Sequence, residues 1–482
     1  MAVRLRSART SSSSGSSNGD AQPDNRLAML DHAFFRGQRA IEQKQVVQVV
    51  WVYEHAVDFE GLKRFNHNLG HGLLGRRIEC SPLPFARHRW VSYREPADID
   101  VATCARPRAD VSDWADERSQ LPTDPESSSG WHLGVLPLSD GSTAVSLVIS
   151  HCLLDGLGVI AVLIDAVMGN TRNLGLPPPS SRSRLRAAAQ DVRLTALDVP
   201  EATRALVALA KLAGRHRHEL RAAAKTARRH RNQIAEQPVP RPVALSDGDG
   251  DESVIVPTIT MHIDIDEWNS RAKVLGGTSN ALMAALAVKL GEHLGRRRAS
   301  DGAVTLQLPM SDRTEGDNRA NAMSFARVTV DPERVTDYLG DVRAAIKKAL
   351  IDMREMPDGS TDLLWLTQFA PRRALNRLSS VMVVGDPDLP VFCSNLGDLG
   401  SVVCRLDGTD AEYATARAIG QNETRRSLEQ AGGMTRMQCW RLRDRVFITV
   451  VAYQPGAENT KPALREVAAR TLADFDLTGE IE

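Results

Sequence analysis

Aromatic residues are scarce in this chain, and its charges cancel. Phenylalanine, tryptophan and tyrosine together make up 5% of the 482 residues, and 60 basic residues balance 60 acidic ones to a formal net charge of +0. Proteins that bind nucleic acid depend on positive charge and often on aromatic stacking. The composition therefore gives no reason to expect nucleic acid as a partner.

Cysteine is also sparse, and long apolar runs are missing. The six cysteines form no Cys-x-x-Cys pair, so we expect them to be reduced and mostly buried; they are Cys80, Cys104, Cys152, Cys393, Cys404 and Cys439. No uninterrupted apolar run is long enough to span a membrane, and the N-terminal stretch lacks the apolar core of a secretory signal. We expect a cytoplasmic protein, either free or attached peripherally to a membrane.

The length and the 42% of hydrophobic residues are sufficient for two substantial lobes. Residues 1–25 are rich in arginine and serine and are expected to form a disordered tail. Strand and helix patterns then predict an N-terminal α/β lobe over residues 26–180 and a C-terminal α/β lobe over residues 253–482. Between them, residues 181–252 are expected to form a basic helical segment and a linker.

The most informative stretch ends in a histidine. Residues 144–150 alternate in the manner of a buried strand, His151 follows, and Asp155-Gly156 precedes an apolar helix over residues 157–168. An imidazole at the end of a strand can face a cavity and act as a general base. The alternative is a buried histidine beside a helix cap, with Asp155 binding backbone amides. Cys152 is a poor candidate nucleophile, because neighbours on an extended chain point in opposite directions.

The string His151-x-x-x-Asp155-Gly156 resembles the signature of the chloramphenicol-acetyltransferase-like acyltransferases, which include condensation domains, polyketide-associated acyltransferases and the wax ester synthase/diacylglycerol acyltransferase group. Further motifs of the last group follow in the same order: Arg76-Arg77, Trp90-Val91, the strand led by Trp131, the helix led by Asn280, the strand that ends in Pro309 and Arg313, and the turn Ser394-Asn395. Three positions depart from the usual pattern, namely Ser150, Ala281 and Leu396-Gly397.

This resemblance implies an α/β fold of two chloramphenicol-acetyltransferase-like lobes with an active-site tunnel between them. His151 would be the general base, and Asp155 would turn away from the substrate to pair with an arginine. The resemblance offers Arg76, Arg77 and Arg313 as that arginine, and Asn280, Ser394 and Asn395 as oxyanion or substrate-binding residues. No metal is required, and no cofactor is expected beyond acyl-CoA as a substrate.

The same resemblance favours an O-acyltransferase that moves a long-chain acyl group from acyl-CoA to the hydroxyl of a lipid or long-chain alcohol. Two alternatives remain. One is a condensation-domain-like or polyketide-associated acyltransferase that uses a carrier-bound acyl group, and the other is a non-catalytic binding protein.

Residues 182–231 carry thirteen lysines and arginines against four acidic residues. Apolar residues recur there at steps of three, four or seven, a pattern that predicts an amphipathic helix with a cationic face. Such a helix suits the anionic surface of a membrane or lipid droplet. A helix packed on the protein body with its basic face in water fits the pattern equally well.

Overall fold

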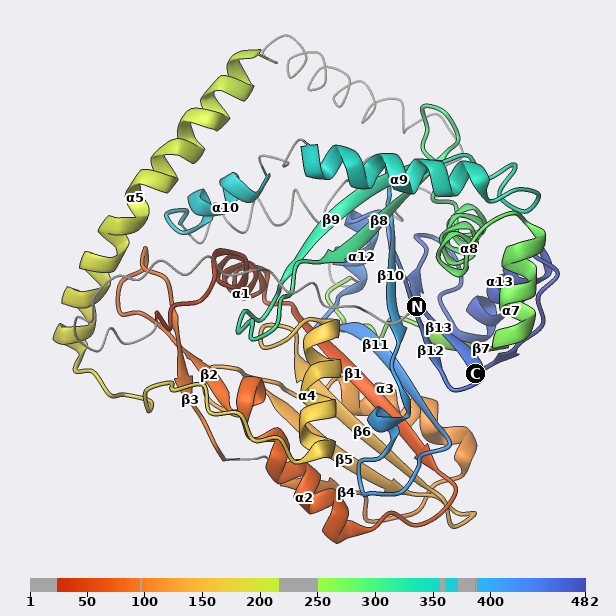
Figure 1. Cartoon of the computed structure of the whole chain (residues 1–482), viewed down its shortest axis with the longest axis horizontal. Coiled ribbons are helices and arrows are strands. Elements are labelled where there is room, and N and C mark those ends of the chain that lie inside the picture. The colour runs from red at the N-terminus through yellow and green to blue at the C-terminus, as the bar shows by residue number, and fades with distance from the viewer. Residues whose placement is uncertain (1–23, 96–97, 216–249, 356–359, 372–385, 387) are drawn as a thin grey trace, which may run out of the picture.

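The computed structural model contains two large β-sheets with helices packed against them, so the α/β fold of two lobes is confirmed (Figure 1). The structure describes residues 24–95, 98–215, 250–355, 360–371, 386 and 388–482. Most of the predicted tail, most of the linker and the predicted basic run beyond Arg215 therefore lie outside the described residues.

The first sheet holds the predicted strand that ends before His151. Its five strands lie in the order β11 (Tyr413–Gln421), β1 (Lys44–Tyr53), β6 (Thr143–Ser150), β5 (Trp131–Pro137) and β4 (Ile99–Val101). Every residue of β6 is buried, because helices cover both faces of the sheet. Helices α2 (Phe59–Leu69) and α4 (Gly156–Met168) pack on one face and α3 (Val111–Ser119) on the other.

The second sheet has seven strands. They lie in the order β14 (Glu480–Ile481), β7 (Thr258–Asp264), β13 (Arg445–Tyr453), β12 (Met434–Leu442), β10 (Val391–Asp398), β8 (Val304–Ser311) and β9 (Met323–Val330). Its core includes the fully apolar face of α8 (Ser279–His293), with α7 (Ile265–Val274), α9 (Gly340–Glu355) and α13 (Lys461–Ala473) around it. The remaining short elements are α1 (Met29–Ile41), η1 (Gly72–Leu74), β2 (Arg76–Glu79), β3 (Arg89–Ser92), η2 (Arg108–Asp110), η3 (Ser401–Cys404) and α12 (Arg425–Gln430).

Strand β11 corrects the predicted division of the chain at residue 253. Although it belongs to the second half of the sequence, β11 pairs antiparallel with β1 in the first sheet, from Lys44 opposite Gln421 to Val52 opposite Tyr413. Its neighbours along the chain, β10 and β12, remain in the second sheet. The first lobe is therefore completed by a strand from the C-terminal half.

Helix α5 (Arg184–Arg215) is long and lies along one side of the molecule beside α10 (Ser360–Thr367) (Figure 1). Its inward face is small and acidic, and Asp198 there forms ion pairs with Arg26 and Arg87 of the first lobe. Helix α5 is thus packed on the protein body, which is one of the two arrangements predicted for the basic segment. None of the described helices alone has the length and apolar character of a membrane span; α7 and α8 reach it only as a pair bent by 86°.

Candidate active site

His151 lies directly after β6, at the wall of a cavity of about 510 Å³ that both sheets line. Its backbone N–H donates to the Gln45 carbonyl of β1 (2.8 Å), which fixes the turn after the strand. The Phe34 ring of α1 packs on the imidazole with ring centroids 5.3 Å apart. Gly156 lines the same cavity, so the predicted motif does face a cavity between the lobes.

Burial lowers the pKa of His151 below its usual range, and the positive charge of Arg436 acts in the same direction. Asp155 and Asn321 oppose this shift and raise the pKa. Because burial dominates, the imidazole is held in its neutral form, which is the form that can accept a proton. Nδ1 of the ring is buried without a hydrogen-bond partner, so Nε2 is the nitrogen open to the cavity.

The Asp155 carboxylate is engaged on both oxygens. Oδ1 accepts from the Gly158 N–H (2.7 Å) and caps α4, whereas Oδ2 accepts from the Ala322 N–H (2.9 Å) and from Arg313 Nη2 (2.8 Å). These three donors occupy most of the roughly four lone-pair sites of a carboxylate, which favours a structural role for Asp155. Asp155 therefore ties the end of the first-lobe hairpin to the segment between β8 and β9.

Only one of the three arginines offered by the sequence contacts Asp155. Arg313 forms the ion pair, while Arg76 donates to the carbonyls of Asn318 and Leu153 and stacks over the Trp90 ring at 3.9 Å. Arg77 instead lies over the ring of Tyr93. Neither arginine of the pair Arg76-Arg77 is a partner of Asp155, because the β2 strand directs them elsewhere.

Sequence reasoning missed a second carboxylate that holds the same segment. Asp31 of α1 is buried, and its oxygens accept from the backbone N–H groups of Ala320 (2.9 Å) and Asn321 (2.7 Å). The Asn321 side chain in turn donates to the His151 carbonyl (3.3 Å). The position of Asp31 in the first turn of a helix looks like ordinary favourable charge at an N-terminus, so the sequence carried no signal for this contact.

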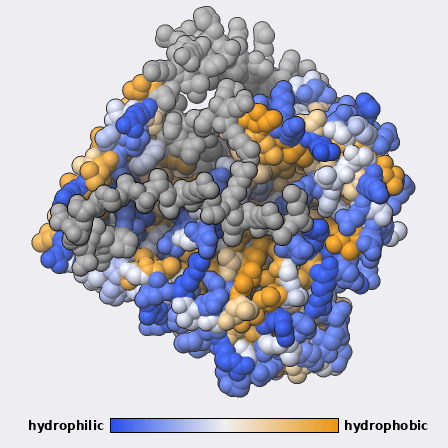
Figure 2. Space-filling view, in the orientation of Figure 1, coloured by the Kyte–Doolittle hydropathy of each residue, from blue (hydrophilic) through white to orange (hydrophobic). Residues whose placement is uncertain are grey.

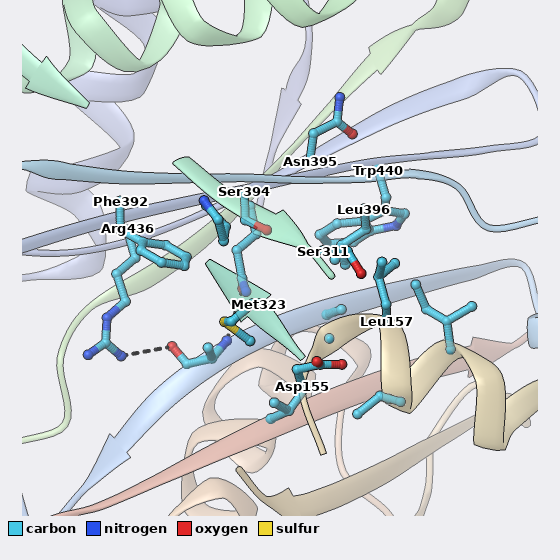
Figure 3. A pocket seen from close by; sticks show the side chains of 18 of the residues that line it. Asp155, Leu157, Ser311, Met323, Phe392, Ser394, Asn395, Leu396, Arg436 and Trp440 are labelled. Atoms are coloured by element: carbon cyan, nitrogen blue, oxygen red, sulfur yellow. Dashed lines mark hydrogen bonds between the residues drawn. The ribbon is translucent and has the colours of Figure 1, made fainter. Parts of the chain in front are cut away.

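The second lobe brings its three candidates to the cavity. Asn395 Nδ2 donates to Asn280 Oδ1 (2.7 Å), and the Gly397 N–H donates to Asn395 Oδ1 (2.8 Å). Asn280 does not cap α8, because Thr278 occupies that position and accepts from the Ala281 N–H. Within the described part of the chain, the Ser394 hydroxyl makes no hydrogen bond. Figure 3 shows Ser394 in the middle of the cavity wall, with Asp155 on the opposite lobe.

An apolar groove leads away from the histidine. On the cavity face of the first sheet, Val47, Val49 and Trp51 of β1 lie opposite Ala418, Ala416 and Ala414 of β11. Directly opposed residues share a face of a sheet, so the three alanines leave a depression beside the larger side chains. Val47 and Trp51 are four residue steps apart along the strand, which gives a length of about 13 Å.

Cys152 points the other way, as predicted. Its side chain is packed in the core of the first lobe, and burial raises the pKa of its thiol to about 12. A thiol that is protonated at neutral pH and does not line the cavity is not available as a nucleophile.

Comparisons with known proteins agree with this geometry at the level of the fold. No protein-family model matches the chain, and no curated protein matches it in sequence. Among solved structures, trichothecene 15-O-acetyltransferase from Fusarium sporotrichioides is 12% identical with a TM-score of 0.55, over 93% of this chain and 94% of that chain. Wax ester synthase/diacylglycerol acyltransferase from Marinobacter aquaeolei VT8 is 13% identical with a TM-score of 0.51, over 94% of this chain and 98% of that chain.

A starter condensation domain of rhizomide synthetase, in a mutant form bound to C8-CoA and Leu-SNAC, is 13% identical with a TM-score of 0.50, over 94% of each chain. The chain therefore has the two-lobed fold of the chloramphenicol-acetyltransferase-like acyltransferases and condensation domains. The resemblance predicted from His151, Asp155 and Gly156 is confirmed for the fold.

Proposed function

We propose that the protein is an acyltransferase that moves an acyl group from acyl-CoA to a hydroxyl acceptor, with His151 as general base. The observation that carries this proposal is a neutral histidine at the meeting point of a cavity between two lobes and an apolar groove. The groove suits an acyl chain, and the imidazole Nε2 open to the cavity suits proton transfer.

His151 can act first as the base and then as the acid of this reaction. His151 Nε2 takes the proton of the acceptor hydroxyl as its oxygen attacks the thioester carbonyl, and a tetrahedral oxyanion forms. When the intermediate collapses, the carbon–sulfur bond breaks and the imidazolium returns the proton to the departing thiolate. The products are an ester and free CoA, and the histidine is regenerated.

The developing oxyanion needs hydrogen-bond donors, which the second lobe can supply. The Ser394 hydroxyl has no other partner among the described residues. The Asn280 amide uses its oxygen to accept from Asn395, so its Nδ2 hydrogens remain available. These roles for Ser394 and Asn280 are part of the proposal.

The test is release of free CoA by the purified full-length protein. We expect CoA release from acyl-CoA only in the presence of a hydroxyl acceptor, and a loss of about 10²–10⁴-fold in His151→Ala. His55→Ala removes an exposed histidine outside the cavity and serves as the matched control. Turnover that requires an amine or a carrier-bound thioester would instead establish the condensation alternative, and tight acyl-CoA binding without turnover would establish a binding protein.

We also propose that α5 attaches the protein peripherally to an anionic membrane or lipid-droplet surface. Leu185, Val192, Val199 and Leu206 recur every seven residues, and their side chains are 48–86% exposed. Exposed arginines flank this stripe, and Figure 2 shows orange and blue side chains mixed along the edge where α5 lies. An apolar stripe bordered by arginine is the pattern of helices that lie on lipid surfaces.

A further inference from the structure

A single arginine stands out among the residues that line the cavity. Arg436 lies on β12, is enclosed by the two lobes, and makes one hydrogen bond, from Nη1 to the Ala418 carbonyl at 3.4 Å. No acidic side chain in the described part of the chain lies within ion-pair distance of it. An arginine has five N–H donors, so most of its hydrogen-bonding capacity is unused.

The positive charge of Arg436 is not neutralised by a neighbouring acidic side chain among the described residues. Glu423 acts on Arg436 electrostatically but forms no ion pair with it, and burial raises the pKa of Glu423, which favours its neutral form. Arg436 is half-buried at the cavity wall, and a guanidinium removed from much of the solvent without a paired anion is costly for a folded protein. The other arginines enclosed in the two lobes are better satisfied: Arg417 pairs with Asp116, Arg313 pairs with Asp155, and Arg296 donates to two backbone carbonyls.

The position of Arg436 relates it to the reaction centre. The Ala418 carbonyl that it contacts belongs to a residue opposite Val47, close to the Gln45 carbonyl that holds His151. Its charge also lowers the pKa of His151. Along the same face of β12 follow Gln438 and then Trp440, so the strand runs from a cationic end to an apolar end. Figure 3 shows Arg436 and Trp440 on opposite sides of Ser394.

The apolar end and the cationic end of the cavity suit different substrates of the proposed reaction. The apolar groove between β1 and β11 takes the acyl chain, and it leads away from the end where Arg436 lies. The group beside Arg436 therefore belongs to the other substrate. A planar guanidinium binds a carboxylate through two parallel hydrogen bonds.

We infer that Arg436 binds a carboxylate of the acceptor, so that the acceptor is a hydroxy acid instead of a neutral alcohol. This inference rests on the proposed acyl transfer and names its second substrate class. Arg436 would hold the carboxylate while His151 removes the proton from the hydroxyl of the same molecule.

The experiment compares 3-hydroxybutyrate and 12-hydroxystearate with their methyl esters, in which a methyl group replaces the negative charge. We expect the kcat/KM for the better acid to exceed that of its ester by at least about tenfold, the effect of one charge-assisted hydrogen bond. Arg436→Met should bring this ratio close to one, and Arg436→Lys should retain part of the preference. Arg441→Met, on the same strand but outside the cavity, is the control.

A purely structural Arg436 would lower turnover of acid and ester alike, and an unchanged ratio in Arg436→Met would overturn the inference. A preference for succinyl-CoA over butyryl-CoA that depends on Arg436 would overturn it too, because the carboxylate would then belong to the donor. If no acceptor supports CoA release, the proposed activity is wrong. The inference about Arg436 is then tested separately, by measuring the binding of the acids and of their esters with calorimetry. Binding of an acid that Arg436→Met abolishes supports it, and equal binding of acid and ester refutes it.

Discussion

The ion pair between Asp155 and Arg313 should contribute to stability through a measurable coupling. In Asp155→Asn the side chain keeps one oxygen for the Gly158 N–H, but an amide group then faces two donors, the Ala322 N–H and Arg313. Two hydrogen bonds to a charged acceptor are lost, at about 1.5–3 kcal/mol each. Arg313 retains the carbonyl of Ala320 at 2.9 Å, which limits the damage. We expect a loss of about 3 kcal/mol in the free energy of unfolding, at the low end for breaking a buried pair.

A double-mutant cycle measures the coupling directly. Urea unfolding followed by tryptophan fluorescence would be compared for the wild type, Asp155→Asn, Arg313→Met and the double variant. We expect a coupling of about 1–3 kcal/mol, because each single change leaves the other partner without its contact. Asp444→Asn, at an exposed carboxylate whose side chain makes no described contact, should stay within about 0.5 kcal/mol of the wild type. Additive effects of the two changes would refute a direct role for the pair.

Three further outcomes are expected. The kcat/KM should fall only at pH values below 6.5, because the folded-state pKa of His151 is lowered and its neutral form persists as the solution is acidified; an acid limb above pH 6.5 in a pH–rate profile would contradict this. Ala416→Leu should fill the apolar groove and lower kcat/KM for long acyl-CoA donors much more than for acetyl-CoA, and equal effects on both would remove the groove from acyl binding. The protein should float with anionic liposomes at low salt, because each basic residue near the lipid surface adds about 1 kcal/mol to the binding free energy. The double variant Val199→Glu with Leu206→Glu should abolish this flotation. Neutral liposomes are the control.

The local elements around the histidine could be predicted because they follow from short-range patterns. Alternation in residues 144–150 predicted strand β6, and the apolar run after Gly156 predicted α4. The cavity residues that came from family motifs, Asn280, Ser394 and Asn395, also lie together.

Contacts between distant parts of the chain could not be predicted in this way. The pairing of β1 with β11 joins residues more than 350 positions apart. The local sequence pattern of β11 does not indicate which of the two sheets this strand joins. Asp31 and Arg436 were missed for the same reason: each is an ordinary charged residue of a helix or strand until the opposite lobe is packed against it. The choice of Arg313 among three arginines likewise required the packed segment between β8 and β9.

The placement of β11 has a consequence for biosynthesis. A ribosome releases the chain from its N-terminus, so β1 emerges early and finds β6 on one side only. Its other edge, in the valine-rich sequence Lys44–Tyr53, keeps its backbone N–H and C=O groups unpaired until residues 413–421 have been made. An open edge of this composition is a template for aggregation. The nascent first lobe is thus exposed for most of synthesis, and any fragment that ends before residue 413 retains that open edge permanently.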